Sequence, residues 1–387
     1  MTRALAFAAP LPAHGYDRAL LVGAVAAGAS PRPVFPSVLH HEESMSSPLS
    51  GLGLTIPLLA APMAGGPTTP ALVTAAARAG GLGLIAGGYK TPEALAQQIT
   101  AVRAQAVPFG VNLFAPNPVP VDAETFHRYA RSIQAEGDRY VLDLTGGDPV
   151  EDDDQWHDKI DLLLADPVPL VGFTFGVPDP AVVAALRGAG TVIVQTVTSA
   201  EEARIASDAG ADLLAVQASA AGGHSGTLTP QHVPPPTPVA DLVTEVRAAV
   251  SLPLIAAGGI ATPADVAAVL RAGAMAAMVG TVLLLADESG TSAVHRAALS
   301  DPARDRTVVT RAFTGRPARA LRNHFTDRYT GEAPAGYPAL HHLTSPLRKA
   351  AAAAGDPERV NLWAGTGYRH ATAEPTDRIL TRLAEPL

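Results

Sequence analysis

Cysteine is absent from the 387-residue chain, and its absence excludes several kinds of chemistry. Disulfide bonds, thiolate nucleophiles, thiolate zinc sites and cysteine-bound iron–sulfur clusters all require that side chain. Redox chemistry in this protein therefore has to come from an organic cofactor or from a metal held by histidine. The histidine pairs His40-His41 and His341-His342 are adjacent and cannot share one helix face, so we expect solvated loop histidines and no metal site.

Charge is also scarce, because Asp, Glu, Lys and Arg make up 17% of the chain and the formal net charge is −8. Such a chain offers no basic field that would attract nucleic acid or anionic lipid. Hydrophobic residues make up 47% of the chain, which is enough to bury a large core. We therefore expect a globular protein whose partner is a small molecule, with no nucleic acid and no membrane.

The N-terminal region lacks an apolar run long enough to span a bilayer. Leu20–Ala29 is apolar, but a spanning helix needs about 20 residues. Arg18 and the small residues up to Ser30 give this stretch a weak likeness to a signal peptide, although its apolar part is rich in alanine and glycine. We expect residues 1–47 to be a disordered extension outside the fold and the protein to be cytoplasmic; a start-site extension and a weak signal both remain open.

From Leu54 onward, short apolar runs alternate with alanine-rich stretches. Many of these stretches begin with a capping side chain and a proline, which is typical of a helix N-terminus: Thr69-Pro70, Thr91-Pro92, Asp179-Pro180 and Thr262-Pro263. Many end at a glycine, as helices often do: Gly80, Gly188, Gly210 and Gly273. The runs between them are almost continuously apolar, which indicates strands covered on both faces: Ile56–Ala61, Gly83–Gly87, Phe109–Phe114, Val171–Gly176, Val192–Val197, Leu213–Ala218, Leu254–Gly258 and Ala276–Val282.

Eight strands separated by helices favour a TIM (β/α)8 barrel over an open doubly wound sheet, and we expect it to span residues 48–285. Two segments interrupt the repeat. Pro116–Asp166 contains the acidic run Glu151–Asp154, which lacks the glycine and the terminal glutamate of a calcium loop and is expected to be a solvated surface excursion. After Leu285 the strand signals stop, so we expect residues 286–387 to form a mostly helical lid or substrate domain that returns to the barrel at its C-terminus.

The stretch Ala221–Gly226 reads AGGHSG and places one histidine between glycines. Glycines allow a close approach of the backbone to a ligand, and an imidazole can donate or accept a proton near neutral pH. A simple turn with a solvated histidine would read the same. The stretch follows the sixth apolar run, and barrel enzymes place their active sites at the C-terminal ends of the strands. His224 is therefore a candidate site residue.

Other strand ends carry small residues and amides that would meet at the same mouth. The loops after strands seven and eight commonly cradle a phosphate group in this fold, and the residues there suit that role: Gly258, Gly259, Gly280 and Thr281. Asn112 and Gln217 would reach the polar edge of a flat ring, unless each caps a neighbouring loop instead. A flat heterocycle with a phosphate tail would fit this set, and flavin mononucleotide (FMN) has that shape.

These residues carry a resemblance to a known family. From about Leu52 to Tyr368 the chain resembles the nitronate monooxygenases, once called 2-nitropropane dioxygenases. The matching pieces, in chain order, are Ala61-Pro-Met-Ala-Gly-Gly66, Pro108-Phe-Gly-Val-Asn-Leu-Phe114, Phe173-Thr-Phe-Gly176, Ala221-Gly-Gly-His-Ser-Gly226, Ala256-Ala-Gly-Gly-Ile260 and Leu362-Trp-Ala-Gly-Thr-Gly-Tyr368.

The resemblance implies a flavin-dependent monooxygenase that oxidises alkyl nitronates with O2 to carbonyl compounds and nitrite. His224 would be the catalytic residue, either stabilising the nitro oxygens or removing the α-proton of a nitroalkane. The residues that would bind FMN are Ala61, Pro62, Met63, Asn112, Gln217, Gly222, Gly223, Gly258, Gly259, Met278, Val279, Gly280 and Thr281.

Two positions depart from the family pattern. Family members often have Gln-Met-Gly-Thr where this chain has Met278-Val-Gly-Thr281, and many carry arginine after the histidine, where this chain has Ser225. Loss of that cation alters how an anionic substrate is held. Two alternatives stay open: a related NAD(P)H-dependent flavin enoyl-acyl-carrier-protein reductase, which shares the barrel and a glycine-flanked histidine, and a flavin-binding barrel without catalysis.

Overall fold

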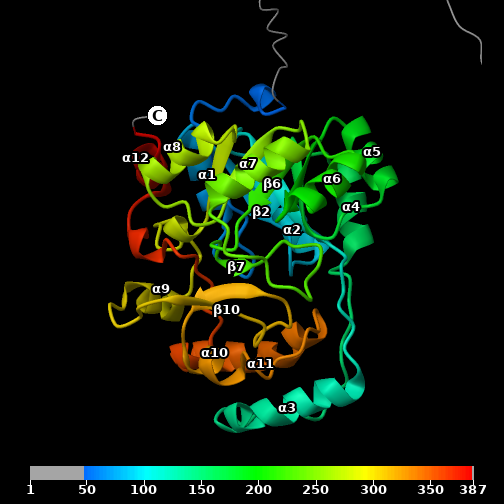
Figure 1. The fold of residues 1–387 in the computed structure, drawn as a ribbon, viewed down its shortest axis with the longest axis vertical. Coiled ribbons are helices and arrows are strands. Elements are labelled where there is room, and N and C mark those ends of the chain that lie inside the picture. The colour runs from blue at the N-terminus through cyan, green and yellow to red at the C-terminus, as the bar shows by residue number, and fades with distance from the viewer. Residues whose placement is uncertain (1–47, 386–387) are drawn as a thin grey trace, which may run out of the picture. The chain divides into compact units, whose positions relative to one another are not determined.

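The computed structural model describes residues 48–385, and the extension expected for residues 1–47 lies outside them. Eight parallel strands form a closed barrel in the order β1-β2-β3-β4-β5-β6-β8-β9, which confirms the predicted TIM barrel (Figure 1). Each strand coincides with one predicted run: β1 (Leu58–Ala60), β2 (Leu82–Ala86), β3 (Phe109–Ala115), β4 (Leu170–Phe175), β5 (Val192–Val197), β6 (Leu213–Gln217), β8 (Leu254–Ala257) and β9 (Ala276–Val279). β9 closes the barrel on β1, with Met278 opposite Leu59.

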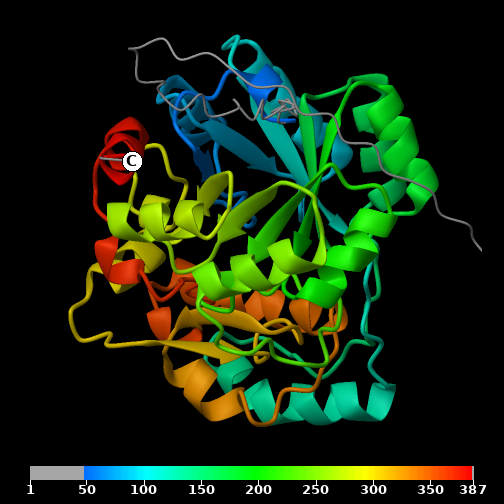
Figure 2. The ribbon, with the colours of Figure 1, turned by 45° about the horizontal axis from the view of Figure 1, so that its top comes forward.

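Helices cover the outside of the barrel (Figures 1 and 2). They are α1 (Pro70–Arg78), α2 (Pro92–Arg103), α4 (Trp156–Ala165), α5 (Pro180–Gly188), α6 (Ala200–Asp208), α7 (Val239–Ala249) and α8 (Pro263–Arg271). The predicted caps begin four of them, because each side chain accepts a hydrogen bond from a backbone N–H of the first turn: Thr69, Thr91, Asp179 and Thr262. Local sequence therefore predicted these helix starts correctly.

Side chains inside the barrel become smaller toward the C-terminal ends of the strands. On β4, Leu170 is fully buried in the interior cluster, whereas Gly172 and Thr174 line a cavity. β6 repeats the pattern, with Leu213 fully buried and Ala215 at the cavity wall. Residues two apart on a strand share one face, so these side chains form continuous inward rows. Their decreasing size opens the barrel at one mouth.

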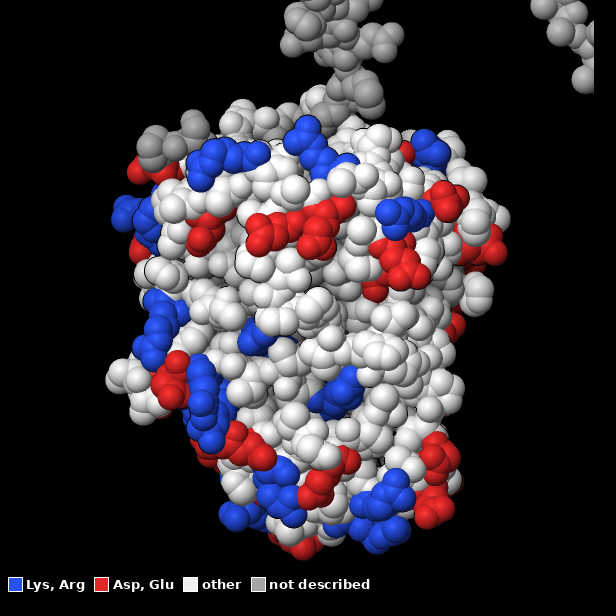
Figure 3. Space-filling model, in the orientation of Figure 1, with Lys and Arg blue, Asp and Glu red and all other residues white. Residues whose placement is uncertain are grey.

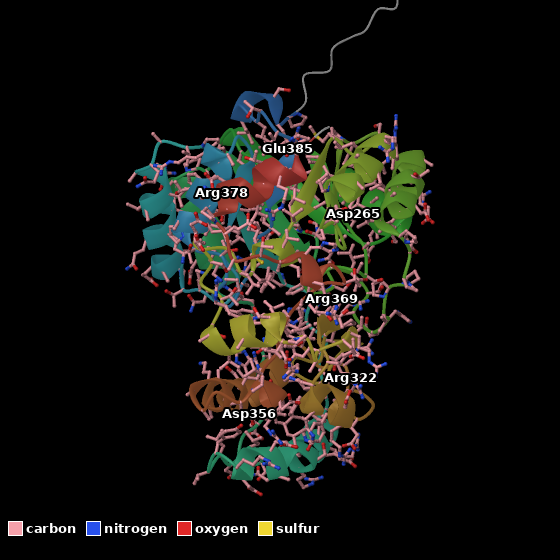
Figure 4. The ribbon with its side chains drawn as sticks, turned by 90° about the vertical axis from the view of Figure 1, so that its left-hand side faces the viewer. Asp265, Arg322, Asp356, Arg369, Arg378 and Glu385 are labelled. Carbon is pink, nitrogen blue, oxygen red and sulfur yellow. The ribbon has the colours of Figure 1, made fainter. Side chains whose placement is uncertain are left out.

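A second layer, here called the cap, lies across that mouth. It consists of α3 (Ala123–Asp138), β7 (Gly223–His224), α9 (Ala293–Ser300), β10 (Thr307–Thr310), β11 (Ala318–Leu321), α10 (His324–Tyr329) and α11 (Ala339–Ala353). Its strands form an antiparallel sheet in the order β10-β11-β7, with His224 opposite Ala318. Figure 4 shows the two layers from the side, with Asp265 in the barrel and Arg322 and Asp356 in the cap. The AGGHSG stretch thus supplies the strand that joins the cap sheet to the barrel.

The cap contradicts two expectations from the sequence. Strand signals were expected to stop after Leu285, but β10 and β11 follow it; each has four residues, too few for a recognisable apolar or alternating pattern. Pro116–Asp166 is more than a surface excursion, because α3 buries one side against the rest of the cap. The residues buried together there include Phe126, Tyr129, Ile133, Phe313 and Phe325.

After the cap, the chain returns to the barrel. The helix α12 (Thr376–Leu383) packs against α1 and α8, and Ile379, Leu380 and Leu383 are buried in the outer core of the barrel. Four short 3-10 turns complete the described elements: η1 (Ser50–Leu52), η2 (Thr281–Leu283), η3 (Pro357–Arg359) and η4 (Tyr368–His370). None of the helices between residues 48 and 385 combines the length and the apolarity that a bilayer span requires.

Candidate active site

A cavity of about 880 Å³ lies at the C-terminal mouth of the barrel, between the barrel and the cap. Its walls come from the loops after β1, β6, β8 and β9 and from the cap helices α9 and α11. This volume is near the upper end of the range for small-molecule and cofactor sites. On the face shown in Figure 3, acidic and basic side chains are mixed over the upper and lower parts, and the band between them carries a few basic side chains.

The structure brings the predicted site residues together around this cavity. His224 lines it, and so do all the residues predicted to bind the cofactor except Val279. The Val279 side chain is 1% exposed and packs outward beneath the helices, because it alternates with the cavity-lining Met278 and Gly280. A side-chain contact from Val279 is therefore excluded. Its carbonyl instead accepts a 2.9 Å hydrogen bond from the Ala61 N–H and fixes the loop after β1.

Glycines bring the backbone close to one part of the cavity. Gly258 and Gly259 have φ angles of +101° and +79°, a left-handed conformation that other residues rarely adopt. A Cβ atom on Gly258 would lie 2.7 Å from the carbonyl oxygen of Ala218. A Cβ atom on Gly222 would lie 2.5 Å from the backbone nitrogen of Gly365. Only glycine fits at these positions, and the cavity wall there is bare backbone.

The late segment Leu362–Tyr368 packs against this backbone. The Gly365 N–H donates to Oγ1 of Thr281 at 2.9 Å, and the Thr366 N–H donates to the Ala220 carbonyl at 3.0 Å. Because the Thr281 hydroxyl accepts here, its own hydrogen remains available for a ligand. A free hydroxyl donor beside glycine backbone suits an anion such as a phosphate group.

The two predicted amides behave differently. Oδ1 of Asn112 accepts a 3.3 Å hydrogen bond from the Thr174 hydroxyl, and its Nδ2 has no hydrogen-bond partner among residues 48–385. Nε2 of Gln217 donates to the His224 carbonyl at 3.2 Å, and its Oε1 accepts from the Gly226 N–H at 2.7 Å. Gln217 therefore caps the AGGHSG loop, which is the alternative role considered for it from the sequence, and has one N–H left for a ligand in the cavity. Asn112 has both of its side-chain N–H groups left.

His224 is held in place by one hydroxyl and enclosed by rings. Its Nε2 lies 2.9 Å from Oγ1 of Thr314. The centroid of its ring lies 5.6 Å from that of Phe175, 6.0 Å from that of Tyr337 and 5.3 Å from that of Trp363. Burial, together with the positive charges of two nearby arginines, lowers the pKa of His224 to about 3. The imidazole is therefore uncharged at neutral pH.

Sequence reasoning missed most of this aromatic wall. Phe175 and Trp363 fall within motifs quoted for the family resemblance, but no local signal pointed to Tyr337, which the cap brings to the cavity. Phe175 ends β4 with a φ of +85°, an unusual conformation for a residue with a large side chain. Strained backbone of this kind often occurs at functional sites.

A cation stands close to Ser225, where the family pattern has arginine. Nε of Arg316, from the turn between β10 and β11, donates to the Ser225 carbonyl at 3.2 Å, and its Nη2 donates to the Thr227 carbonyl. Cζ of Arg316 lies 4.0 Å from the centroid of the Phe175 ring, and the side chain is fully buried. The cap thus places a positive charge beside the histidine loop, and this charge belongs to Arg316 instead of the residue after His224.

The pair His341-His342 was expected to be solvated in a loop, and this was wrong because both residues lie on α11 and line the cavity. The His341 ring stacks on Tyr89 with centroids 4.3 Å apart. Burial is the main cause that lowers the pKa of His341 to about 2. Nε2 of His342 lies 2.6 Å from Oδ2 of Asp152, which ties α11 to the acidic run.

The acidic run is solvated only in part. Glu151, Asp152 and Asp153 are exposed, as expected, but Asp154 is not. Its Oδ2 lies 2.8 Å from Nζ of Lys159, whose side chain is 1% exposed, and its Oδ1 accepts a 3.0 Å hydrogen bond from the Tyr89 N–H. Asp154 therefore anchors the loop that carries Tyr89 at the cavity wall.

Comparisons with known proteins show the family of the chain. The family model for nitronate monooxygenase matches residues 46–385. A probable nitronate monooxygenase of Staphylococcus aureus (strain Newman) is 34% identical over 344 residues, which cover 86% of this chain and 94% of that protein. A probable nitronate monooxygenase of Staphylococcus saprophyticus is 35% identical over 339 residues, 84% of this chain and 93% of that protein.

Solved structures give the same picture. Nitroalkane oxidase from Streptomyces ansochromogenes is 45% identical and superposes with a TM-score of 0.80, covering 87% of this chain and 97% of that one. FabK from Thermotoga maritima is 27% identical with a TM-score of 0.66, covering 87% and 94%. The match of the family model across the whole described region, together with these relatives, shows that the chain belongs to the nitronate monooxygenase family of oxidoreductases.

Proposed function

We propose that the protein catalyses the FMN-dependent oxidation of alkyl nitronates by O2, with a carbonyl compound and nitrite as products. Membership of the nitronate monooxygenase family and the 45% identity to a nitroalkane oxidase support the substrate class. The observation that carries the proposal is an uncharged His224, held by Thr314, on the wall of a cavity that also contains glycine-rich backbone suited to an anion.

The residues present fit FMN. The glycine backbone at Gly258 and Gly259, which has no room for side chains, and the Thr281 hydroxyl would hold its phosphate. Nδ2 of Asn112 and the remaining N–H of Gln217 would donate to the polar edge of its ring. When bound, FMN supplies the electron-accepting chemistry that the side chains lack.

His224 would serve the reaction as a hydrogen-bond donor. The single hydrogen of the Thr314 hydroxyl can go to Nε2 of His224, at 2.9 Å, or to the Arg316 carbonyl, at 3.4 Å. When it goes to Nε2, the imidazole hydrogen is on Nδ1, which has no hydrogen-bond partner in the described chain. That N–H would donate to a nitronate oxygen and stabilise its negative charge. The opposite tautomer would leave a proton acceptor on Nδ1, but an imidazole whose pKa is about 3 is a weak base for removing the α-proton of a neutral nitroalkane. The site therefore favours substrates that arrive already deprotonated.

The test is nitrite release by the purified, flavin-loaded protein. Ethyl nitronate under air should give nitrite and acetaldehyde, and removal of O2 should abolish product formation. Nitroethane that has not been deprotonated should react more slowly at the same concentration and pH. Fully loaded protein that releases no nitrite from the nitronate would refute the proposal.

The same preparation separates the two alternatives. Oxidation of NADH or NADPH that depends on an enoyl thioester would identify a reductase. Bound FMN with neither reaction would identify a binding protein, because a fold and a cofactor site do not establish turnover.

A further inference from the structure

Arg348 is a cation that lines the cavity without a carboxylate partner. It lies on α11, and its hydrogen-bond partners among the described residues are all uncharged groups. Nε donates to Oγ1 of Thr344 at 3.1 Å, Nη2 to the His341 carbonyl at 2.9 Å and Nη1 to Oδ1 of Asn361 at 3.4 Å. Within residues 48–385, no Asp or Glu oxygen lies within 4.0 Å of its nitrogens.

Two other arginines of the cap, Arg359 and Arg304, are paired with carboxylates. Arg359 lies 2.6 Å from an oxygen of Glu136 and 3.0 Å from one of Asp356. Arg304 lies 2.7 Å from an oxygen of Glu358. These pairs join parts of the cap to each other, as expected for structural arginines. Arg348 differs from them in facing the cavity and in lacking an anion.

The guanidinium of Arg348 also has a donor to spare. It carries five N–H groups, and its one further hydrogen-bond contact with the described part of the chain is a 3.3 Å approach of Nη2 to Nδ1 of His341. Four contacts leave at least one N–H, on Nη1, for a ligand. A cation held partly out of water among neutral dipoles is stabilised when an anion approaches it. An oxygen of a planar oxyanion would accept from this N–H and complete the hydrogen bonds of the guanidinium.

We propose that Arg348 binds the planar oxyanion of the substrate, the nitronate group, and so determines the preference for nitronates over neutral nitroalkanes. This inference rests on the proposed function and names the residue that distinguishes an anionic substrate from a neutral one. His224 is uncharged and cannot supply that charge. Arg316 is fully buried against the Phe175 ring, and its Nε and Nη2 already donate hydrogen bonds to backbone carbonyls. Lys90, another cation at the cavity, donates to the Ala86 carbonyl at 2.8 Å.

The kinetic test compares one anionic and one neutral substrate. In Arg348→Gln, kcat/KM for ethyl nitronate should fall about 10- to 100-fold, the usual range for a charge-assisted hydrogen bond, mainly through KM. With neutral nitroethane the loss should stay below about threefold, because this substrate carries no charge with which Arg348 could pair. Arg348→Lys keeps the charge without the planar fork and should recover part of the nitronate activity. Equal losses with both substrates would overturn the inference.

Arg131→Gln is the matched control. Arg131 is an arginine of the cap helix α3, but it is exposed and does not line the cavity. Its substitution removes the same charge and should leave both rates unchanged. A loss as large as that in Arg348→Gln would show that the net charge of the cap, and not the guanidinium at the cavity, attracts the anion.

A binding measurement separates the failure of this inference from the failure of the proposed function. Sodium nitrate, a planar oxyanion that is not turned over, is titrated by calorimetry into the flavin-loaded protein at constant ionic strength. Wild type and Arg131→Gln should bind it, and Arg348→Gln should bind at least tenfold more weakly. If nitrate binding depends on Arg348 but no nitronate is oxidised, the anion site stands and the proposed reaction fails. If nitronate is oxidised but neither nitrate binding nor KM depends on Arg348, the reaction stands and this inference fails.

Discussion

The barrel and the cap contribute different chemistry to one cavity. The barrel supplies bare backbone, small polar groups and amides, such as Gly259, Thr281 and Asn112. The cap supplies most of the ionisable groups, such as Arg348 and Tyr337, and His224 belongs to the strand that joins the two. Backbone geometry suits a cofactor that stays the same, and side chains suit a substrate that varies. We therefore expect barrel substitutions to change cofactor binding and cap substitutions to change substrate selection.

The largest effect is expected in the barrel, from Gly259→Val. A Cβ at this position would lie 3.0 Å from Cβ of Ala220, and the φ of +79° disfavours a β-branched residue. The purified variant should contain little flavin and should have almost no activity even when FMN is added. Flavin content is measured by absorbance after denaturation.

Gly190→Val is the control for backbone strain. Gly190 has a similar φ of +88°, but nothing lies within 4 Å of its added Cβ, and it does not line the cavity. This variant should lose stability and keep its flavin. If Gly259→Val also kept full flavin occupancy, the phosphate end would not lie against Gly259.

A smaller but still large effect is expected where the two layers meet, from His224→Ala. The variant should keep its flavin, because Gly258, Gly259 and Thr281 are unchanged, and should lose roughly 100-fold or more in kcat/KM for the nitronate. A donor role predicts similar losses with nitronate and nitroalkane, and a base role predicts a selective loss with the nitroalkane. Thr314→Val, which removes the partner of Nε2, should cost less than His224→Ala. Wild-type rates in His224→Ala would reduce the AGGHSG stretch to a turn beside the flavin.

The same contrast explains what the sequence could predict. The barrel repeats local signals, such as the Thr262-Pro263 cap and the apolar run Leu254–Gly258, and a general rule places its site at the strand ends. Strand alternation also indicates that the Val279 side chain points away from those of its neighbours, which leaves only its backbone for the predicted cofactor cradle.

The cap could not be predicted in this way. Thr314 reaches His224 from 90 positions along the chain. Arg348 and Tyr337 reach the cavity through the packing of α11 across the mouth. Such placements depend on tertiary packing, which no short pattern in one sequence records.

Acid should weaken the cap through its buried histidines. Burial is the first cause that lowers the pKa values of His224, His295 and His341 to about 3, 4 and 2. Between about pH 6.5 and these pKa values, each imidazole is neutral in the folded state and protonated in the unfolded state. The free energy of unfolding therefore falls as the pH drops below about 6.5. The slope for each histidine approaches about 1.4 kcal/mol per pH unit, because the unfolded state binds one more proton.

Urea unfolding between pH 7 and pH 5 measures this slope while carboxylates of ordinary pKa remain ionised. Removing one buried histidine with His295→Gln should make the slope shallower. His157→Gln, at an exposed position on α4, controls for the effect of the substitution itself. Equal slopes in wild type and His295→Gln would mean that His295 is not held neutral.

The smallest effect should come from one hydroxyl of the barrel. Thr281→Val removes the group that accepts from the Gly365 N–H and that would donate to the phosphate. Flavin should dissociate about tenfold more readily, because one hydrogen bond to a charged group is lost and one backbone N–H is left unpaired. Thr281→Ser keeps the hydroxyl and should bind flavin as wild type does. In the fully loaded Val variant, the KM for ethyl nitronate should not change, which is the reverse of the pattern expected for Arg348→Gln. A raised KM with unchanged flavin affinity would place the substrate, and not the cofactor, beside Thr281. The barrel would then contribute to substrate binding, and the assignment of cofactor binding to the barrel and substrate selection to the cap would be wrong.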